Sequence, residues 1–413
     1  MPLREIPVEQ LRFGMYVSEL DRPWTETPFM FQGFVLKTDR QLEALKKYCK
    51  KVYVDPEKIE LPDPVRSGSG PIPSAQLSGE IKEQLKQKVR GDVVYKELTR
   101  VEEELPRART VFAETGDVVQ KISAKVLTDN VFDAPQAKEA VTQVTDSVVR
   151  NPDAMMLLAK MREKGAQTLN RALQVSVYMT VFGRFLQLAR DRIETLGTMG
   201  LLQDVGFLKL PQGLAERRAA LSGAERELFK THIAHTVETL SKTPGLPPDL
   251  PGLASLHHER FDGSGYPRGL KGNALPMLGS IASIVDTFDS LTAPEPYGDN
   301  MTPSAALNVL YQNRGSQFHA ALIEQFIQCV GVFPVGSVVE LNSGEVGVVI
   351  AQNQTRRLQP RVMVVKDAAG NPMNPHKILD LVKEPKWTPE EPYRIKRTLE
   401  SDKVQIDPRE LFL

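Results

Sequence analysis

Alternating hydrophobic and polar positions occur near both ends of the chain, and helical spacing dominates the region between them. Near the start, FGMYVSEL and MFQGFVLK are rich in β-branched and aromatic residues, which is typical of strands. From about Glu80 to Ala189, apolar residues recur every three or four positions, which predicts amphipathic helices. After Val332, PVGSVVELNSGEVGVVIAQN alternates again around the turn NSGE, which predicts a β-hairpin. The pattern predicts a mainly α protein with small β-rich parts.

Local signals predict where several segments begin. Asp133 before Ala-Pro predicts a helix N-cap, and Ser222 with Glu225 three residues later forms a capping-box pattern. The stretch 61–79 is rich in Pro, Gly and Ser, which predicts a linker. We therefore expect a β-rich module at 1–60, the linker at 61–79, connecting helices at 80–160, a helical domain at 161–332, a small β unit at 333–385 and a polar tail at 386–413.

Composition narrows the class of protein. The chain has 413 residues, which favours two or three domains. Its 52 basic and 52 acidic residues leave no net charge to attract a nucleic acid polymer or an anionic membrane. Two isolated cysteines, Cys49 and Cys329, fit a reducing compartment. We see no secretory signal and no membrane-length apolar run, so we expect a cytoplasmic protein. The helices at 80–160 could pair between chains to form a homodimer.

Candidate chemistry gathers between residues 200 and 300. Four of the six histidines lie within about thirty residues. Mixed imidazole and carboxylate groups from several helices are a usual way to build a metal site in a helical fold. Adjacent histidines point about 100° apart on a helix, so both could reach one centre only where the helix ends. The ionisable groups in this region are Asp204, His232, His235, His257, His258, Glu259, Asp286 and Asp289, and each lies in or beside apolar sequence.

Structural interpretations compete with each of these candidates. Asp204 alone could be a helix cap or the partner of an arginine. His235 shares a helical face with His232, so one of the two is a surface neighbour rather than a ligand. His319 and His376 are isolated and are expected to be structural or exposed. DGSGYP alone could be any turn, because Gly and Pro are common there. The metal-site hypothesis rests on these histidines, carboxylates and the loop occurring together.

The string HHERFDGSGYPRGLKGNALP, with SIASIVDTFDSLTAPEPY and MTPSAAL, resembles the HD-GYP family of bacterial cyclic-di-GMP phosphodiesterases over about residues 165–330. The N-terminal module resembles the uncharacterised domain often found ahead of such units. The resemblance implies an HD-type helical bundle and metal-dependent phosphodiester hydrolysis, with iron or manganese as the usual metal. It implies that Asp204, His232, His257, His258 and Asp286 bind metal, and that the loop Gly265, Tyr266, Pro267 shapes the site or contacts partners.

Several positions depart from the family pattern. Gln203 replaces the His of the His-Asp pair, Phe207 replaces a Lys, and Arg171 replaces the upstream ligand His. Gln167 replaces a carboxylate, and Glu295 and Gly298 replace two arginines. A neutral amide is a poor ligand for transition metals, and a guanidinium opposes cation binding. The resemblance therefore implies one retained three-His, one-Asp metal site and a second site that has been lost.

Three functions remain open at this point. The first is a degenerate HD-GYP protein with impaired hydrolysis, which binds cyclic-di-GMP or a partner such as a diguanylate cyclase domain and holds one divalent transition metal. The second is an active phosphodiesterase, in which Asp204 or Glu259 positions water at the remaining metal. The third is a scaffold with an empty site. In the first case Arg171 could contact a phosphate and preserve binding without turnover.

Overall fold

The computed structural model describes residues 4–22, 27, 29, 34–36, 39–55, 79–160, 167–211, 213–214, 221–293, 298–353, 356 and 358–399. They divide into two compact units. One comprises Met1–Lys82, Thr302–Gln312 and Gly331–Leu413, and the other comprises Glu83–Met301 and Asn313–Val330. The linker predicted at 61–79 and the last residues of the expected tail lie almost entirely outside the described residues.

The N-terminal region forms a four-stranded antiparallel sheet with one helix. Its strands are β1 (Arg4–Pro7), β2 (Tyr16–Leu20), β3 (Phe34–Val35) and β4 (Lys51–Asp55), in the order β1-β4-β2-β3. A short 3₁₀ turn, η1 (Val8–Gln10), and α1 (Asp39–Tyr48) complete the module. Alternate strand residues such as Val17, Val52 and Val54 turn inward and are buried against Leu45 of α1.

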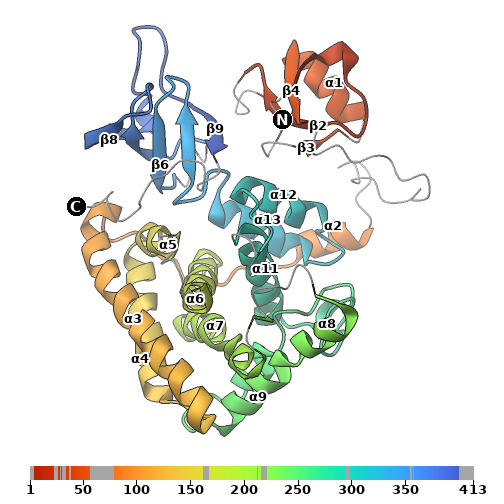
Figure 1. Cartoon of the computed structure of the whole chain (residues 1–413), viewed down its shortest axis with the longest axis vertical. Coiled ribbons are helices and arrows are strands. Elements are labelled where there is room, and N and C mark those ends of the chain that lie inside the picture. The colour runs from red at the N-terminus through yellow and green to blue at the C-terminus, as the bar shows by residue number, and fades with distance from the viewer. Residues whose placement is uncertain are drawn as a thin grey trace. The chain divides into compact units, whose positions relative to one another are not determined.

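Helices make up most of the larger unit. The division between the units falls within α2 (Gly79–Lys86), after Lys82. The next helices are α3 (Val101–Asp129), α4 (Ala134–Arg150), α5 (Pro152–Lys160), α6 (Gln167–Phe185) and α7 (Arg190–Leu202). After the 3₁₀ turn η5 (Val205–Lys209) come α8 (Gly223–Lys230), α9 (His232–Lys242), α10 (Leu250–Ala254), the 3₁₀ turn η7 (Gly272–Ala274), α11 (Met277–Thr292) and α13 (Ala320–Val330). Figure 1 shows α3 and α4 side by side and α6 against α7.

The predicted helix starts are confirmed. The Asp133 side chain accepts a hydrogen bond from the Gln136 backbone N–H at 3.0 Å. Ser222 and Glu225 form the reciprocal capping box, so two otherwise unpaired backbone donors are satisfied. No helix in the described part of the chain has the length and apolar character needed to span a bilayer.

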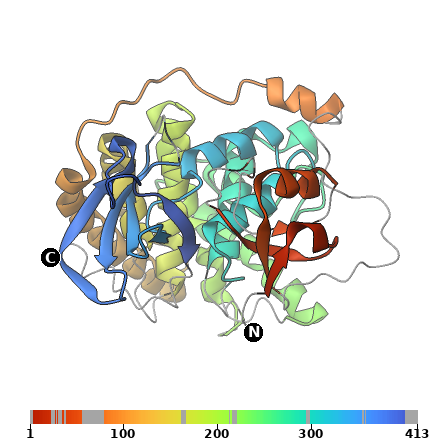
Figure 2. The same cartoon turned by 90° about the horizontal axis from the view of Figure 1, so that it is seen from above.

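One predicted helical segment is not helical. Residues 87–100 run as an extended strap between α2 and α3, visible in Figure 2. The backbone N–H groups of Gly91 and Val93 donate to the carbonyls of Leu186 and Gln187 at 2.8 and 3.1 Å. The strap replaces the helical hydrogen bonds of these residues with bonds to the segment after α6, a partner distant in sequence.

The C-terminal region forms a five-stranded antiparallel sheet, and α12 (Pro303–Gln312) belongs to the same unit. The strands are β5 (Val338–Leu341), β6 (Val346–Ala351), β7 (Arg361–Lys366), β8 (Pro372–Asp380) and β9 (Ile395–Leu399), in the order β8-β7-β6-β5-β9, with η8 (Leu381–Lys383) after β8. The predicted NSGE hairpin joins β5 to β6, with Gly344 at φ 86°. Residues 395–399, expected in a polar tail, instead form an edge strand on β5.

Candidate metal centre

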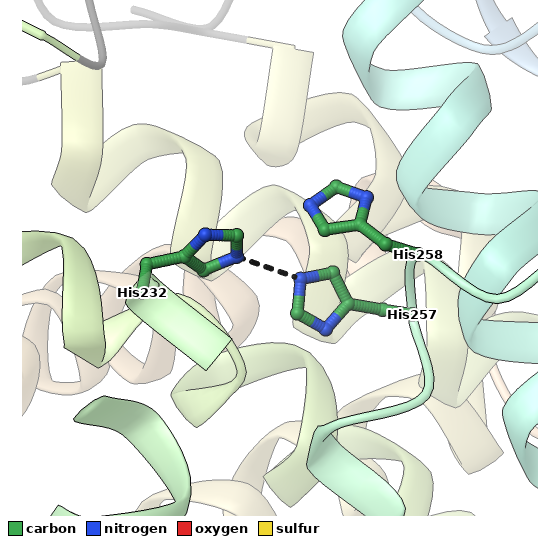
Figure 3. A group of neighbouring side chains, drawn as sticks. All are labelled: His232, His257 and His258. Atoms are coloured by element: carbon green, nitrogen blue, oxygen red, sulfur yellow. Dashed lines mark hydrogen bonds between the residues drawn. The ribbon is translucent and has the colours of Figure 1, made fainter. Parts of the chain in front are cut away.

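Three histidines converge at the ends of two helical segments. His232 is the first residue of α9, whereas His257 and His258 lie in the irregular segment after α10 ends at Ala254. One ring nitrogen of each lies within 4.8 Å of the others, and Figure 3 shows the three rings turned toward one another. Adjacent histidines reach one centre here because the helix has ended, as the sequence predicted.

Hydrogen bonds to backbone carbonyls fix the orientations of the His232 and His257 rings. Nδ1 of His232 lies 2.7 Å from the Phe229 carbonyl, and Nδ1 of His257 lies 2.8 Å from the Ala254 carbonyl. A carbonyl only accepts, so each Nδ1 carries the donated proton and Nε2 is the lone-pair nitrogen of the neutral ring. The two Nε2 atoms face each other at 3.3 Å. Two facing lone pairs repel unless a cation or a proton lies beside them, so this geometry suits a cation.

Asp204 adds a carboxylate oxygen to the imidazole cluster. Its Oδ1 lies 3.4 Å from Nε2 of His257 and 3.9 Å from Nε2 of His232. This buried oxygen accepts no hydrogen bond within the described residues, whereas Oδ2 accepts one from Arg171. A buried acceptor left without a donor is costly unless something else satisfies it. The three imidazoles and this oxygen therefore fit one divalent transition metal.

Close packing of η5 against α9 places Asp204 beside His232. A Cβ on Gly206 would lie 2.0 Å from the His232 carbonyl oxygen, so only glycine allows this approach. Thr236 joins the two segments, because its hydroxyl donates to the Gln203 carbonyl at 3.0 Å and accepts from the Gly206 N–H at 3.0 Å.

Arg171 lies on the other side of Asp204 and contacts three carboxylates. Its Nε donates to Asp204 Oδ2 at 2.8 Å, its second nitrogen to Asp289 Oδ2 at 2.5 Å and its third to Asp286 Oδ1 at 2.5 Å. All four side chains are at most 15% exposed. Each guanidinium nitrogen is already engaged, which argues against the expected phosphate contact from Arg171.

Gln203 belongs to the same cluster. Its amide nitrogen donates to Asp286 Oδ1 at 3.2 Å, the oxygen that also accepts from Arg171. The other oxygen of Asp286 lies 3.5 Å from Nδ1 of His258. Two of the positions that depart from the family pattern thus serve as hydrogen-bond donors to the carboxylates.

The protein environment favours neutral rings at His232 and His258 but a charged carboxylate at Asp204. Burial, followed by the neighbouring His257, lowers the pKa of His232 to about 3, and burial also lowers the pKa of His258 well below its ordinary value. Burial opposes the charge of Asp204, but Arg171 outweighs it and holds the pKa of this carboxyl well below its usual range. Two of the imidazoles are therefore neutral at pH 7, as metal ligands must be, while the Asp204 carboxylate is charged.

The Gly-Tyr-Pro loop folds back onto the histidines. The buried Glu259 carboxylate accepts from the backbone N–H groups of Arg268 and Leu270 at 2.7 and 2.9 Å. A Cβ on Gly265 would lie 2.5 Å from the His258 carbonyl oxygen. The Tyr266 ring stacks on His258 with centroids 4.7 Å apart, and Pro267 follows it. Because Glu259 holds the loop, it is not free to position water.

The remaining predicted positions are dispersed. Glu295 lies outside the described residues, and Gln167 begins α6. A Cβ on Gly298 would lie 2.2 Å from the Ser290 carbonyl oxygen, so a larger residue does not fit there. His235 is partly exposed and lies 3.9 Å from Glu238, and the ring of buried His319 lies 2.8 Å from the Gln87 amide oxygen. Neither belongs to the imidazole cluster.

Sequence reasoning gave Asp289 no role at the site. Asp289 lies one helical turn after Asp286 on α11, and both carboxylates reach Arg171. The three-residue spacing was a signal that both share one face of the helix. Nothing in the local sequence identified the arginine that pairs with them, because Arg171 lies on α6.

Comparison with known proteins places these regions among HD-domain proteins. Residues 153–322 match the model of the HD domain, residues 3–137 a domain of unknown function (DUF3391), and residues 338–388 a KOW domain associated with the HD domain. The chain is 27% identical over 392 residues to the cyclic di-GMP phosphodiesterase PA4108 of Pseudomonas aeruginosa, covering 92% of this chain and 89% of the relative.

Two further relatives match a smaller part of the chain. The 3'3'-cGAMP-specific phosphodiesterase 2 of Vibrio cholerae is 30% identical, over 41% of this chain and 32% of its own length. The cyclic di-GMP phosphodiesterase response regulator RpfG of Xanthomonas campestris is 32% identical, over 35% of this chain and 38% of its own length. The HD-domain match, the flanking domain matches and these relatives support the resemblance to the HD-GYP family.

Proposed function

We propose that this chain is a cytoplasmic HD-GYP protein of cyclic-dinucleotide signalling that holds one divalent cation and hydrolyses its ligand poorly. The observation that carries the proposal is the arrangement of Arg171 with Asp204, Asp286 and Asp289. The guanidinium contacts Asp204 and Asp286, the two remaining residues that the family resemblance assigns to a second metal position. A fixed positive charge there opposes a second cation.

The imidazole cluster supports one bound cation. His232 and His257 direct Nε2 atoms toward a common point, and Oδ1 of Asp204 lies beside them with no hydrogen-bond donor among the residues that the structure describes. A divalent cation at this point would polarise a phosphate oxygen and lower the pKa of water. The protein's part is to hold the rings of His232 and His257 in place through the carbonyls of Phe229 and Ala254. Iron and manganese are candidates, and this ligand set accepts either.

The net charge of the site favours slow hydrolysis. The three carboxylates and the single guanidinium of Arg171 leave two negative charges, which one divalent cation neutralises. A pair of divalent cations would instead give the site an excess positive charge for the phosphodiester transition state. Losing one such electrostatic group typically slows an enzyme by about 10²–10³-fold. Phe207 supplies no cation of its own.

The proposed ligand is a cyclic dinucleotide. The relatives are named for cyclic di-GMP or 3'3'-cGAMP, and the one that spans most of this chain is named for cyclic di-GMP. We therefore propose cyclic-di-GMP as the first ligand to test. The alternative within this proposal is a protein partner, such as a diguanylate cyclase domain, that contacts the loop carrying Tyr266.

An active phosphodiesterase remains the second candidate. Its support is the long match to PA4108, a protein named as a phosphodiesterase. In that case Asp204 is the group beside the cation, because the Glu259 carboxylate accepts two backbone N–H groups. A scaffold without metal is the third candidate.

Metal content, ligand binding and cleavage on one preparation distinguish these functions. We expect about one metal equivalent per chain, binding of cyclic-di-GMP, and little cleavage. We expect the double variant Arg171→His with Gln203→His to take up more metal and to cleave faster. The exposed Arg190→His is the matched control and should change neither. Two equivalents with rapid turnover in the unmodified protein would contradict the proposal, and near-zero metal would favour the scaffold.

A further inference from the structure

The His232 ring packs against two aromatic side chains as well as against the other histidines. Phe207 stacks on it face to face, with centroids 3.9 Å apart and planes inclined by 11°. Phe229 contacts it edge-on at 5.4 Å and also supplies the carbonyl that accepts from Nδ1. Phe207 and Phe229 contact each other at 4.8 Å. His232 therefore has one ring face and one ring edge fixed before any ligand binds.

The turn that carries Asp204 also carries Phe207. The Phe207 N–H donates to the Asp204 carbonyl at 3.0 Å within η5. One short turn thus places a carboxylate on one side of His232 and an aromatic ring on its face. Phe207 also packs, together with Leu210, against a small apolar cluster of Leu214, Leu221 and Phe229. The His232 ring beside it is fully buried.

We propose that Phe207 is a positioning residue for the cation site, acting through the orientation of His232. The inference rests on the proposed function, because it assumes that the imidazole cluster binds a divalent cation. An imidazole that can rotate loses entropy when it is fixed by a metal, and the stacked ring removes that freedom in advance. Aromatic pairs at this distance add a specific attraction beyond apolar burial. Without the stacked ring, the hydrogen bond from Nδ1 to the Phe229 carbonyl would have to hold Nε2 toward His257 with less support from packing.

Cobalt titration of the full-length protein, stripped with a chelator, tests this inference. We expect Phe207→Leu to raise the dissociation constant for Co²⁺ about fivefold to tenfold and to alter the visible absorption spectrum of the bound ion. Phe207→Tyr keeps the stacked ring and should stay within about twofold of the unmodified protein. The control is Phe185, another half-buried phenylalanine, which is the last residue of α6 and contacts Arg90. Phe185→Leu should leave Co²⁺ binding unchanged.

The outcomes separate this inference from the proposed function. Failure of the unmodified protein to bind Co²⁺ contradicts the proposed function itself. Normal binding by the unmodified protein with equal affinity and spectrum in Phe207→Leu overturns only the role of Phe207. Phe207→Met is a second non-aromatic variant that decides the question if Phe207→Leu does not fold. Comparable loss in Phe185→Leu would show a general effect on stability and would also overturn the positioning role.

Discussion

Replacing Arg171 with methionine removes the charge that the three carboxylates share. Methionine keeps a long apolar stem, so the change chiefly deletes the guanidinium. Asp204, Asp286 and Asp289 are left as buried carboxylates at most 11% exposed. We expect the variant to fold less stably at pH 7 and to recover part of that loss in acid, where Asp204 takes up a proton.

The structure sets the size of this effect. At an effective dielectric constant of about 20, each close pair attracts by about 4 kcal/mol. Desolvation of the four ions and repulsion between the carboxylates offset much of that sum, and removing one partner of a buried pair typically costs about 3–5 kcal/mol. The lowered pKa of Asp204 means that its contribution is present above about pH 4 and is lost as the pH falls further. The difference between the two proteins should therefore shrink as the pH falls below about 4.

Urea unfolding followed by circular dichroism at 222 nm measures the difference. This signal follows the helices, which lie mostly in the unit that holds the site. A chelator excludes stabilisation by bound metal. Arg190→Met is the control, because Arg190 pairs with Asp146 and Glu194 while half exposed, and should lose less than about 1 kcal/mol. Equal losses in the two variants would refute the charge-sharing argument.

Three further substitutions test the surrounding structure. Gly206→Ala places a Cβ against the His232 carbonyl, so we expect about 1–3 kcal/mol lower stability and weaker Co²⁺ binding; a normal melting temperature would contradict the close packing. Glu104→Gln should cost about 2–3 kcal/mol at pH 7, because buried Glu104 accepts from Arg150 and Ser147. Burial raises the pKa of Glu104, but these hydrogen bonds outweigh it and lower the pKa. The contribution of Glu104 to folding stability is therefore present above about pH 4.5, and the urea midpoints of the two proteins should converge in acid. Glu259→Gln offers one acceptor where two backbone N–H groups bind, so amide exchange across 261–272 should accelerate, and unchanged exchange would exclude Glu259 as the anchor of the loop.

Local features of the fold could be predicted because their causes lie within a few residues. The Ser222 capping box and the NSGE hairpin turn depend on neighbours three or four positions away, and both form as expected. The predicted helical core depended on the spacing of apolar residues, which directly reflects burial on one helix face. The adjacent His257 and His258 indicated a helix end, because two neighbouring rings cannot otherwise share a centre.

Features that depend on distant partners were missed. Residues 87–100 have some helical spacing, but bonds to the carbonyls after α6 hold them extended. β9 pairs with β5, where Arg397 lies opposite Glu340, and the proline-broken sequence around it gave no sign of that partner. A segment of intermediate propensity takes the structure that its partner stabilises.

The candidate site also has features that the sequence predicts and features that depend on distant partners. The sequence by itself determined which residues can bind a metal, and it determined that Arg171, Gln203 and Phe207 cannot. Only the tertiary structure decided what those three do instead. Arg171 meets carboxylates 33, 115 and 118 residues away, Gln203 donates to Asp286, and Phe207 stacks on His232. A sequence specifies the charge and shape of each side chain, but pairing and stacking depend on which helices pack together, because they act over only a few ångströms.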